Sequence, residues 1–281
     1  MAKRNRTVTI AKQEKWEKEG RGQGAGKDYI PGLKTQDVPS MGKKTRVHGH
    51  LTDRQHDFLS THEKDYCFIL ENSDSVRDIR EQYPLPLEIT LHIAEECGIS
   101  HPVDPVSRVP INLSTDFLIT IKEDDGNFIQ IARTVKQKDD LLNERVIEKF
   151  EIERRYWLQK GVNWGIVTEN EINKTLVRNI ISIRRYMDIS NIDSFVDLQE
   201  RQKQILIEAI KSKICGENIV IREISDDFDE TMSLPPGTGL SIVKHLLITK
   251  QIEINLFEKI NYNKPQKVAI VTRLIKGAQA V

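Results

Sequence analysis

The sequence predicts an α/β (α+β) protein, in which a mixed β-sheet domain precedes a smaller, mostly helical domain. Three observations lead to this prediction. Residues 114–136 read as two apolar strands around a polar turn that contains Asp-Gly. A segment with helical periodicity follows, and then a short buried strand over residues 162–168. Beyond residue 170 the apolar pattern is mainly helical.

The first of these features is a β-hairpin that starts at Ser114 and ends at Lys136, with its turn at residues 122–127. Folding about Gly126 brings Asp116 opposite Lys136. A metal-dependent phosphodiesterase needs such a pair, because the carboxylate holds a divalent cation and the lysine helps to position the attacking water. The alternative interpretation is a surface ion pair, worth only about 0.2–1 kcal/mol.

After the hairpin, a helix is predicted over residues 141–160, with Asp139 and Asp140 as candidate caps and Gly161 as its stop. A crossover helix returns the chain to a third strand beside the hairpin. Residues 162–168 therefore complete a mixed sheet.

A second helix is predicted upstream, from Ser60 to about Asn72. Glu63 lies in its first turn, and two roles for it remain open. With Ser60 as N-cap, Glu63 stands at the N3 position and the two form a capping box. In the other interpretation, the helix presents Glu63 as a second acidic group beside the open end of the hairpin.

Several segments resemble a known enzyme family. Glu63, Asp116 and the Val135-Lys136 pair follow the PD-(D/E)xK nuclease pattern. The chain also resembles TnsA, the endonuclease subunit of heteromeric Tns-type transposases, over roughly residues 19–172. The resemblance lies in residues 19–24 (EGRGQG), 26–31 (GKDYIP), 78–84 (DIREQYP), 148–149 (EK) and 153–157 (ERRYW).

The resemblance implies a restriction-endonuclease-like fold for residues 1–170 and a DNA endonuclease that uses Mg²⁺, with Mn²⁺ as a substitute. It implies Glu63, Asp116 and Lys136 as catalytic residues, and the two acids as metal ligands. Thr134 departs from the pattern, since the position two before the lysine is usually Glu, Asp or Gln. A threonine has no carboxylate, but its backbone carbonyl suits Mg²⁺, and Thr134 is therefore the third expected ligand.

The resemblance also implies partners. It predicts an enzyme that cuts double-stranded DNA at transposon ends, on the strand whose 5′ end borders the transposon. A TnsB-like recombinase would process the 3′ ends, and a TnsC-like ATPase would regulate the assembly. Two alternatives remain open: a stand-alone restriction or repair nuclease, and a catalytically degenerate scaffold subunit, which only Thr134 supports.

Residues 171–281 are expected to form a second domain. Its predicted elements are helices over 175–186, 194–213 and 238–250, an acidic turn at 226–229, and a two-stranded ribbon of 252–257 and 267–271. Helices followed by a ribbon indicate a winged-helix-like domain for DNA binding, partner docking or both. The helix 238–250 is the candidate docking element, and its few basic groups leave both kinds of partner open.

Composition limits the remaining functions. Lys+Arg 42 balances Asp+Glu 42, so DNA binding must come from local patches. Basic residues from Lys3 to Lys27 and within 43–50 are candidates, although both also read as solvated faces. The glycine-rich segment 20–27 is expected to be a flexible turn and not a phosphate loop, because Asp28 replaces the required Ser or Thr. Without an apolar run of about 18 residues or a signal peptide, a cytoplasmic protein with no membrane segment is expected.

Overall fold

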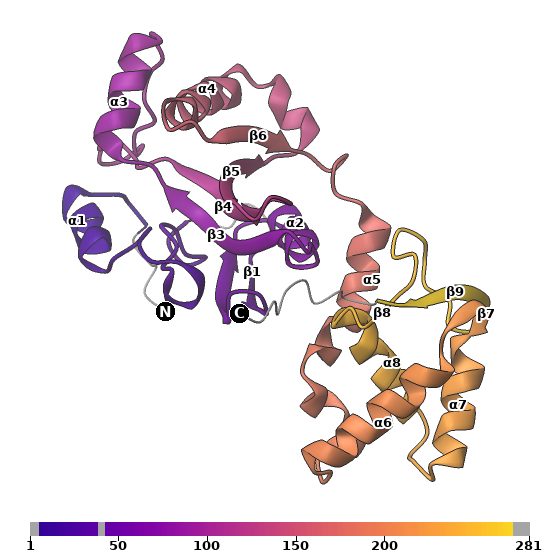
Figure 1. Cartoon of the computed structure of the whole chain (residues 1–281). Helices are drawn as coiled ribbons and strands as arrows, with labels where there is room; N and C mark the ends of the chain where they lie inside the picture. The colour runs from indigo at the N-terminus through magenta and orange to yellow at the C-terminus, as the bar shows by residue number, and fades with distance from the viewer. Residues whose placement is uncertain (1–5, 39–42, 272–281) are drawn as a thin grey trace, which may run out of the picture. The chain divides into compact units, whose positions relative to one another are not determined.

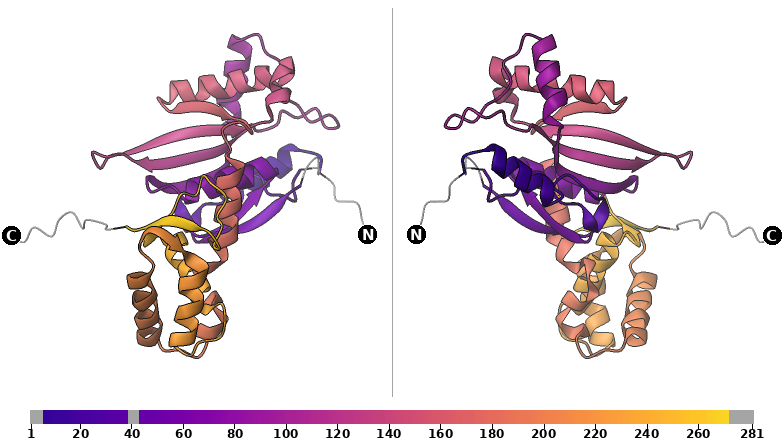
Figure 2. Two further views of the ribbon diagram at one scale, coloured as in Figure 1. Left: turned by 90° about the vertical axis from the view of Figure 1, so that its right-hand side faces the viewer. Right: turned by 90° about the vertical axis from the view of Figure 1, so that its left-hand side faces the viewer.

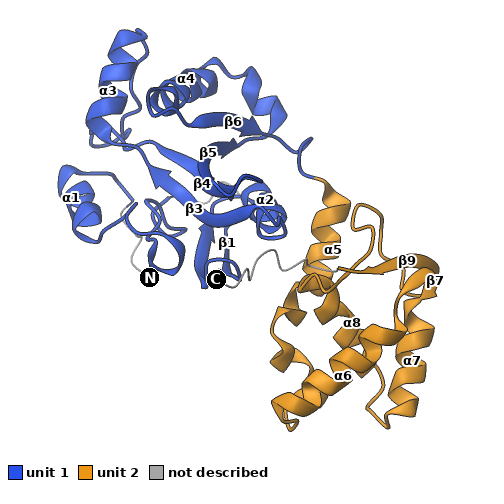
Figure 3. Ribbon diagram, in the orientation of Figure 1, with its two compact units in different colours: residues 1–172 blue, residues 173–281 orange. Residues whose placement is uncertain are grey.

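The computed structural model describes residues 6–38 and 43–271. The chain divides into two compact units, residues 1–172 and 173–281 (Figure 3). Lys3 and Arg4, two of the basic residues that are candidates for DNA contact, lie outside the described residues. None of the helices in the described part of the chain has the length and apolar character needed to cross a membrane.

Unit 1 is built around a mixed sheet. Its elements are α1 (Ile10–Lys18), β1 (Thr45–Gly49), β2 (Arg54–Phe58), α2 (Thr61–Glu71), β3 (Val76–Pro84), α3 (Leu87–Glu96), β4 (Ser114–Lys122), β5 (Phe128–Val135), α4 (Glu144–Gln159) and β6 (Asn163–Val167) (Figure 1). The sheet order is β3-β4-β5-β6; β5 and β6 are parallel and the other pairs antiparallel. The predicted mixed sheet is confirmed, while β3 at its edge was not predicted.

The register of the β4–β5 hairpin differs from the prediction. The observed pairs end with Phe117 and Arg133, so the next position along sets Asp116 across from Thr134. The prediction that Asp116 lies opposite Lys136 is therefore wrong by two residues. Because the error is an even number, it leaves every side chain on its predicted face of the sheet.

The start of α4 also differs from the prediction. The residues before it form a 3₁₀ turn, Lys138–Leu142, which contains both aspartates that were expected to cap the helix. The cap is instead Asn143, whose side-chain oxygen accepts a hydrogen bond of 2.9 Å from the backbone N–H of Arg145. The two aspartates belong to the turn because the helix starts only at Glu144.

Two helices cover opposite faces of this sheet (Figure 2). On one face, Leu118 of β4 shares a buried cluster with Ile152 and Trp157 of α4. On the other, the ring of Phe117 packs against Tyr66 of α2, with 5.6 Å between the ring centroids. Neighbouring residues of a strand point to opposite faces, so this alternation places β4 at the centre of unit 1.

The glycine-rich segment is ordered and docks on β3. The backbone N–H of Gly26 donates to Oδ1 of Asp78 (3.1 Å), and the N–H of Gly32 donates to the carbonyl of Gln82 (2.9 Å). Gly22 has a φ of +81°, and a Cβ there would lie 2.3 Å from a side-chain carbon of Pro84. Only glycine satisfies both conditions, so this segment is fitted to the strand, in contrast to the flexible turn that was expected.

Unit 2 is mostly helical with one small sheet. Its elements are α5 (Lys174–Arg184), α6 (Glu200–Lys213), β7 (Gly216–Val220), α7 (Ile221–Thr231), α8 (Thr238–Ile248), β8 (Ile252–Glu253) and β9 (Pro265–Ile270). The predicted ribbon exists as the antiparallel β8–β9 pair, but β9 also pairs with β7. The predicted acidic turn at 226–229 is wrong, because these residues lie inside α7.

The helix α8 is the core of unit 2. Nine of its 11 residues are buried, and a Cβ on Gly239 would come within 2.7 Å of the carbonyl oxygen of Ser225. The half-exposed Lys244 has its ammonium group over the rings of Tyr186 and Tyr262. A helix enclosed in this way offers little surface to a DNA groove, which disfavours it as the docking element.

Candidate active site

The first acidic residue of the site is fixed by the start of α2. The hydroxyl of Ser60 accepts a hydrogen bond of 3.1 Å from the backbone N–H of Glu63, so Ser60 is the predicted N-cap. The reciprocal half of a capping box is replaced by another bond, since Oε2 of Glu63 accepts from the N–H of Leu59 (3.0 Å). The Glu63 carboxyl group is buried, with 5% of the residue exposed.

The second acidic residue lies near the end of β4 that faces away from the hairpin turn. Oδ2 of Asp116 accepts a hydrogen bond of 2.7 Å from the backbone N–H of Val135. Oδ1 of Asp116 accepts from the side-chain amide of Gln82, at 2.9 Å. The same amide nitrogen lies 3.4 Å from Oε2 of Glu63. One glutamine therefore joins the two acids that the sequence had singled out.

Burial and mutual repulsion perturb both carboxyl groups. Burial and, to a smaller extent, the charge of Asp116 raise the pKa of Glu63 to about 8. Burial also raises the pKa of Asp116 to about 6, although the Val135 N–H and the charge of Lys136 act in the opposite direction. Two buried acids that resist ionisation together are typical of a catalytic or cation-binding site.

Lys136 directly follows β5 at the same end of the sheet. Its ammonium group pairs with Oδ2 of Asp140 at 3.2 Å, and its side chain is 36% exposed. The positive charge nevertheless lowers the pKa of Asp116, so it acts on the acidic pair. The surface-pair interpretation required an ion pair between Lys136 and Asp116. The ion-pair partner of Lys136 is Asp140 instead.

Thr134 directs its side chain towards α4. Its hydroxyl donates a hydrogen bond of 2.5 Å to Oε1 of Glu153, and it accepts one of 3.3 Å from the indole of Trp164. Burial raises the pKa of Glu153 to about 7, although hydrogen bonds from Thr115 and Thr134 lower it. Glu153 was not among the predicted site residues, and its place in the ERRYW segment is the only sequence signal for it.

Comparisons with known proteins show the family of the chain. A family profile described as TnsA-like endonuclease N terminal matches residues 73–169, and a second, TnsA endonuclease C terminal, matches residues 171–256. The chain is 38% identical over 269 residues to the transposon Tn7 transposition protein TnsA of Escherichia coli. The aligned region covers 94% of this chain and 93% of that protein. The chain belongs to the TnsA endonuclease family. The family resemblance is confirmed, and the chain is a DNA endonuclease.

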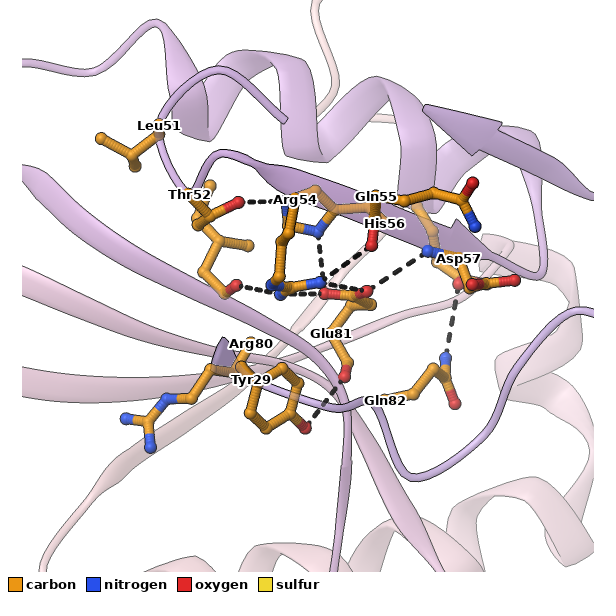
Figure 4. A network of polar contacts seen from close by, with 12 residues as sticks. Tyr29, Leu51, Thr52, Arg54, Gln55, His56, Asp57, Arg80, Glu81 and Gln82 are labelled. Carbon is orange, nitrogen blue, oxygen red and sulfur yellow. Dashed lines mark hydrogen bonds and ion pairs between the residues drawn. The ribbon is translucent and has the colours of Figure 1, made fainter. Parts of the chain in front are cut away.

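A buried ionic network surrounds Glu81, the residue that precedes Gln82 (Figure 4). The guanidinium group of Arg54 donates to both carboxylate oxygens of Glu81, at 2.8 and 2.5 Å. Nδ1 of His56 lies 2.8 Å from the same carboxylate, and the hydroxyl of Tyr29 donates to the Glu81 carbonyl (3.1 Å). Burial alone would raise the pKa of Glu81, but the bonds from Arg54 and His56 lower it to about 2. This network fixes the residue next to Gln82.

The oxygen donors of the candidate site suit a hard cation. Within residues 6–38 and 43–271, no group of three or more His, Cys, Asp or Glu side chains is arranged to hold a metal ion. Glu63 and Asp116 supply two carboxylates, so further protein ligands would have to be carbonyl or amide oxygens. Mg²⁺ prefers oxygen ligands and commonly takes only one or two carboxylates from the protein. The residues present therefore fit the metal that was expected.

Proposed function

We propose that this chain is the Mg²⁺-dependent endonuclease subunit of a cut-and-paste transposition system, and that it cuts the strand whose 5′ end borders the transposon. The observation that carries the proposal is the meeting of two buried carboxyl groups, Glu63 and Asp116, at one amide beside Lys136. The family membership and the similarity to a transposition protein of transposon Tn7 support the biological setting.

Each residue has a distinct task in this proposal. Glu63, Asp116 and the backbone carbonyl of Thr134 would hold Mg²⁺. The bound ion would polarise the scissile phosphate and stabilise the leaving 3′ oxygen. Lys136, whose side chain is 36% exposed, orients or deprotonates the attacking water. Mn²⁺ is expected to replace Mg²⁺ at these ligands.

The partners follow from the family. Double-stranded DNA at the transposon ends is the substrate, a TnsB-like recombinase processes the 3′ ends, and a TnsC-like ATPase regulates the assembly. We further propose that residues 171–281 serve docking to these partners or to DNA. Because α8 is enclosed by the unit's own core, this contact would use other surfaces of unit 2.

Strand-specific cleavage tests the proposal. Transposon-end DNA labelled on each strand would be incubated with the recombinase, the ATPase and this chain in Mg²⁺. The expected product is a cut on the 5′-bordering strand, which is lost with Asp116→Asn and kept with Asp124→Asn, a control on the exposed hairpin turn. Cleavage of naked DNA by the chain alone would favour a stand-alone nuclease. Normal excision by Asp116→Asn would identify a scaffold.

A further inference from the structure

Gln82 holds the position that a cation would take between the two acids. Its Nε2 lies 2.9 Å from Oδ1 of Asp116 and 3.4 Å from Oε2 of Glu63, and the residue is 2% exposed. In a site without metal, an N–H group between two carboxyl groups supplies the partial positive charge that their oxygens need. The amide therefore reaches the point at which an ion shared by these acids would sit.

The backbone at Gln82 has a left-handed conformation. Its φ is +49°, a conformation that costs a residue other than glycine on the order of 1 kcal/mol or more. Two anchors hold it there. The N–H of Gly32 donates to the Gln82 carbonyl, and the preceding residue, Glu81, is tied to Arg54. Retained strain of this kind is typical of functional positions.

The amide of Gln82 can also reverse without losing its other partner. Its Oε1 accepts a hydrogen bond of 3.0 Å from the hydroxyl of Ser114. A hydroxyl group both donates and accepts, so after a half-turn of the amide Ser114 accepts from Nε2 instead. The half-turn directs Oε1 of Gln82 towards Glu63 and Asp116.

The position that usually supplies the third side-chain ligand does not do so here. The hydroxyl of Thr134 is committed to Glu153, on the helix α4. A site with two carboxylates and no third acidic side chain leaves room for a neutral oxygen donor, and amide oxygens suit hard divalent cations.

We propose that Gln82 is a further ligand of the metal ion, and that its side-chain oxygen binds the ion together with Glu63 and Asp116. The amide nitrogen takes the place of the ion when no metal is bound, and the amide oxygen turns towards the ion when it enters. This inference rests on the metal dependence in the proposed function.

Metal binding to the intact chain tests the inference without any cleavage. Calorimetric titration with Mn²⁺ would give the affinity, and luminescence lifetimes of bound Tb³⁺ in H₂O and D₂O would count the water molecules on the ion. Gln82→Ala is expected to weaken Mn²⁺ binding by about tenfold or more and to add one water molecule to bound Tb³⁺. Gln82→Asn, which tolerates the left-handed backbone but has a shorter side chain, is expected to behave in the same way.

Two further variants make the test specific. Gln82→Glu keeps an oxygen donor and is expected to bind Mn²⁺ at least as tightly as the wild type. Gln13→Ala removes another buried glutamine with two hydrogen bonds, to Pro110 and Asn112, and is expected to change neither readout. Thermal unfolding of each variant checks that it is folded.

The outcomes separate the inference from the function on which it rests. A wild-type chain that binds neither Mn²⁺ nor Tb³⁺ contradicts the proposed metal dependence. If the wild type binds metal and Gln82→Ala and Gln82→Asn do so with the same affinity and hydration, the inference alone is overturned. It is also overturned if Gln82→Glu binds more weakly than Gln82→Ala, because Gln82 then acts only as an N–H donor that holds the two acids.

Discussion

The backbone N–H of Val135 donates a hydrogen bond of 2.7 Å to Oδ2 of Asp116. Val135 directly precedes Lys136, so this bond sets the carboxylate against the strand end from which the lysine projects. One oxygen of Asp116 is thereby used to fix the orientation of the group. The other oxygen accepts a hydrogen bond from the side-chain amide of Gln82, and it is the oxygen that binds the metal ion in the proposed function.

Asp116→Asn is expected to abolish cleavage of the 5′-bordering strand. The N–H of Val135 needs an acceptor, so the asparagine oxygen would face Val135 and its NH₂ group would face the metal position. An NH₂ group cannot bind a cation, and the expected loss exceeds the ~10–100-fold typical of removing an outer-shell partner. Denaturing gels of end-labelled DNA would measure it, with the recombinase's 3′ cut as internal control. Equal rates for wild type and variant would exclude Asp116 as a ligand.

Lys136→Ala is expected to lower the cleavage rate by ~10²–10⁴-fold, the usual range for a group that acts in proton transfer. DNA binding should be nearly unchanged, because one charge is a small part of a phosphate-contact surface. Single-turnover rates and gel-shift titrations would separate the two effects. Lys138→Ala, an exposed lysine two residues along, is the matched control. Weak binding with a normal rate at saturation would reduce Lys136 to a phosphate contact.

Glu63→Gln separates the two roles of Glu63. Glutamine keeps an oxygen that can accept from the N–H of Leu59, so the helix start is preserved. It lacks the negative charge that a Mg²⁺ ligand supplies. We expect a folded protein without cleavage activity, in which Mn²⁺ recovers part of the rate. Full activity in Mg²⁺ would leave Glu63 with a capping role only.

The raised pKa of Glu63 predicts a pH dependence of stability in the metal-free chain. Its folded pKa of about 8 lies above the ordinary value of 4.5, so the folded state holds the proton more tightly. The resulting stabilisation is complete below pH 4.5 and is lost as the pH rises through 8. Asp116, raised to about 6, acts with the same sign.

Glu63→Gln should therefore unfold at a higher temperature than the wild type at pH 9 in EDTA, by about 3 °C or more. The difference should shrink towards pH 5, where the wild-type carboxyl group is protonated. Thermal unfolding followed by circular dichroism between pH 5 and 9 would measure it. Parallel curves for the two proteins would show that Glu63 is not perturbed.

Substitutions in α8 distinguish a core helix from a docking helix. Leu246 is fully buried, and Leu246→Ala is expected to cost ~2–5 kcal/mol of stability. Lys244→Ala, on the same helix, removes a half-exposed charge that lies over two tyrosine rings, and should cost only about 0.5–1 kcal/mol. Denaturant titration gives both values. In a docking helix, Leu246→Ala would change the stability of the chain little. Lys244→Ala would instead greatly weaken the binding of a partner or DNA.

The parts of the fold that the sequence predicted are those with a clear apolar period. The hairpin, the helices that begin near Ser60 and Glu144, and the strand β6 all have one. The strand β3 does not, because its segment DIREQYP is mostly polar. Its most deeply buried charge is Glu81, and the partner that makes this burial possible, Arg54, lies in another strand 27 residues earlier. Pairing across such a distance leaves no periodic signal in the sequence.

The residues of the candidate site could also be predicted only in part. Glu63 and Asp116 could be singled out from local patterns, and the structure brings them to one amide. Gln82 and Glu153 could not, because their roles depend on contacts with residues 19 or more positions away. The register error at the hairpin has a local cause, since the strands pair symmetrically about Asp125 and the prediction folded them about Gly126.

The docking of the glycine-rich segment on β3 affects how the chain folds during synthesis. The partners of Gly26 and Tyr29 in β3 lie 52 residues further along the chain. At a synthesis rate of roughly 5–20 residues per second, the ribosome needs several seconds to supply them. Throughout that interval the segment lacks its hydrogen bonds to β3. Synthesis of β3 would then supply these bonds together with Glu81, the carboxylate that Arg54 binds.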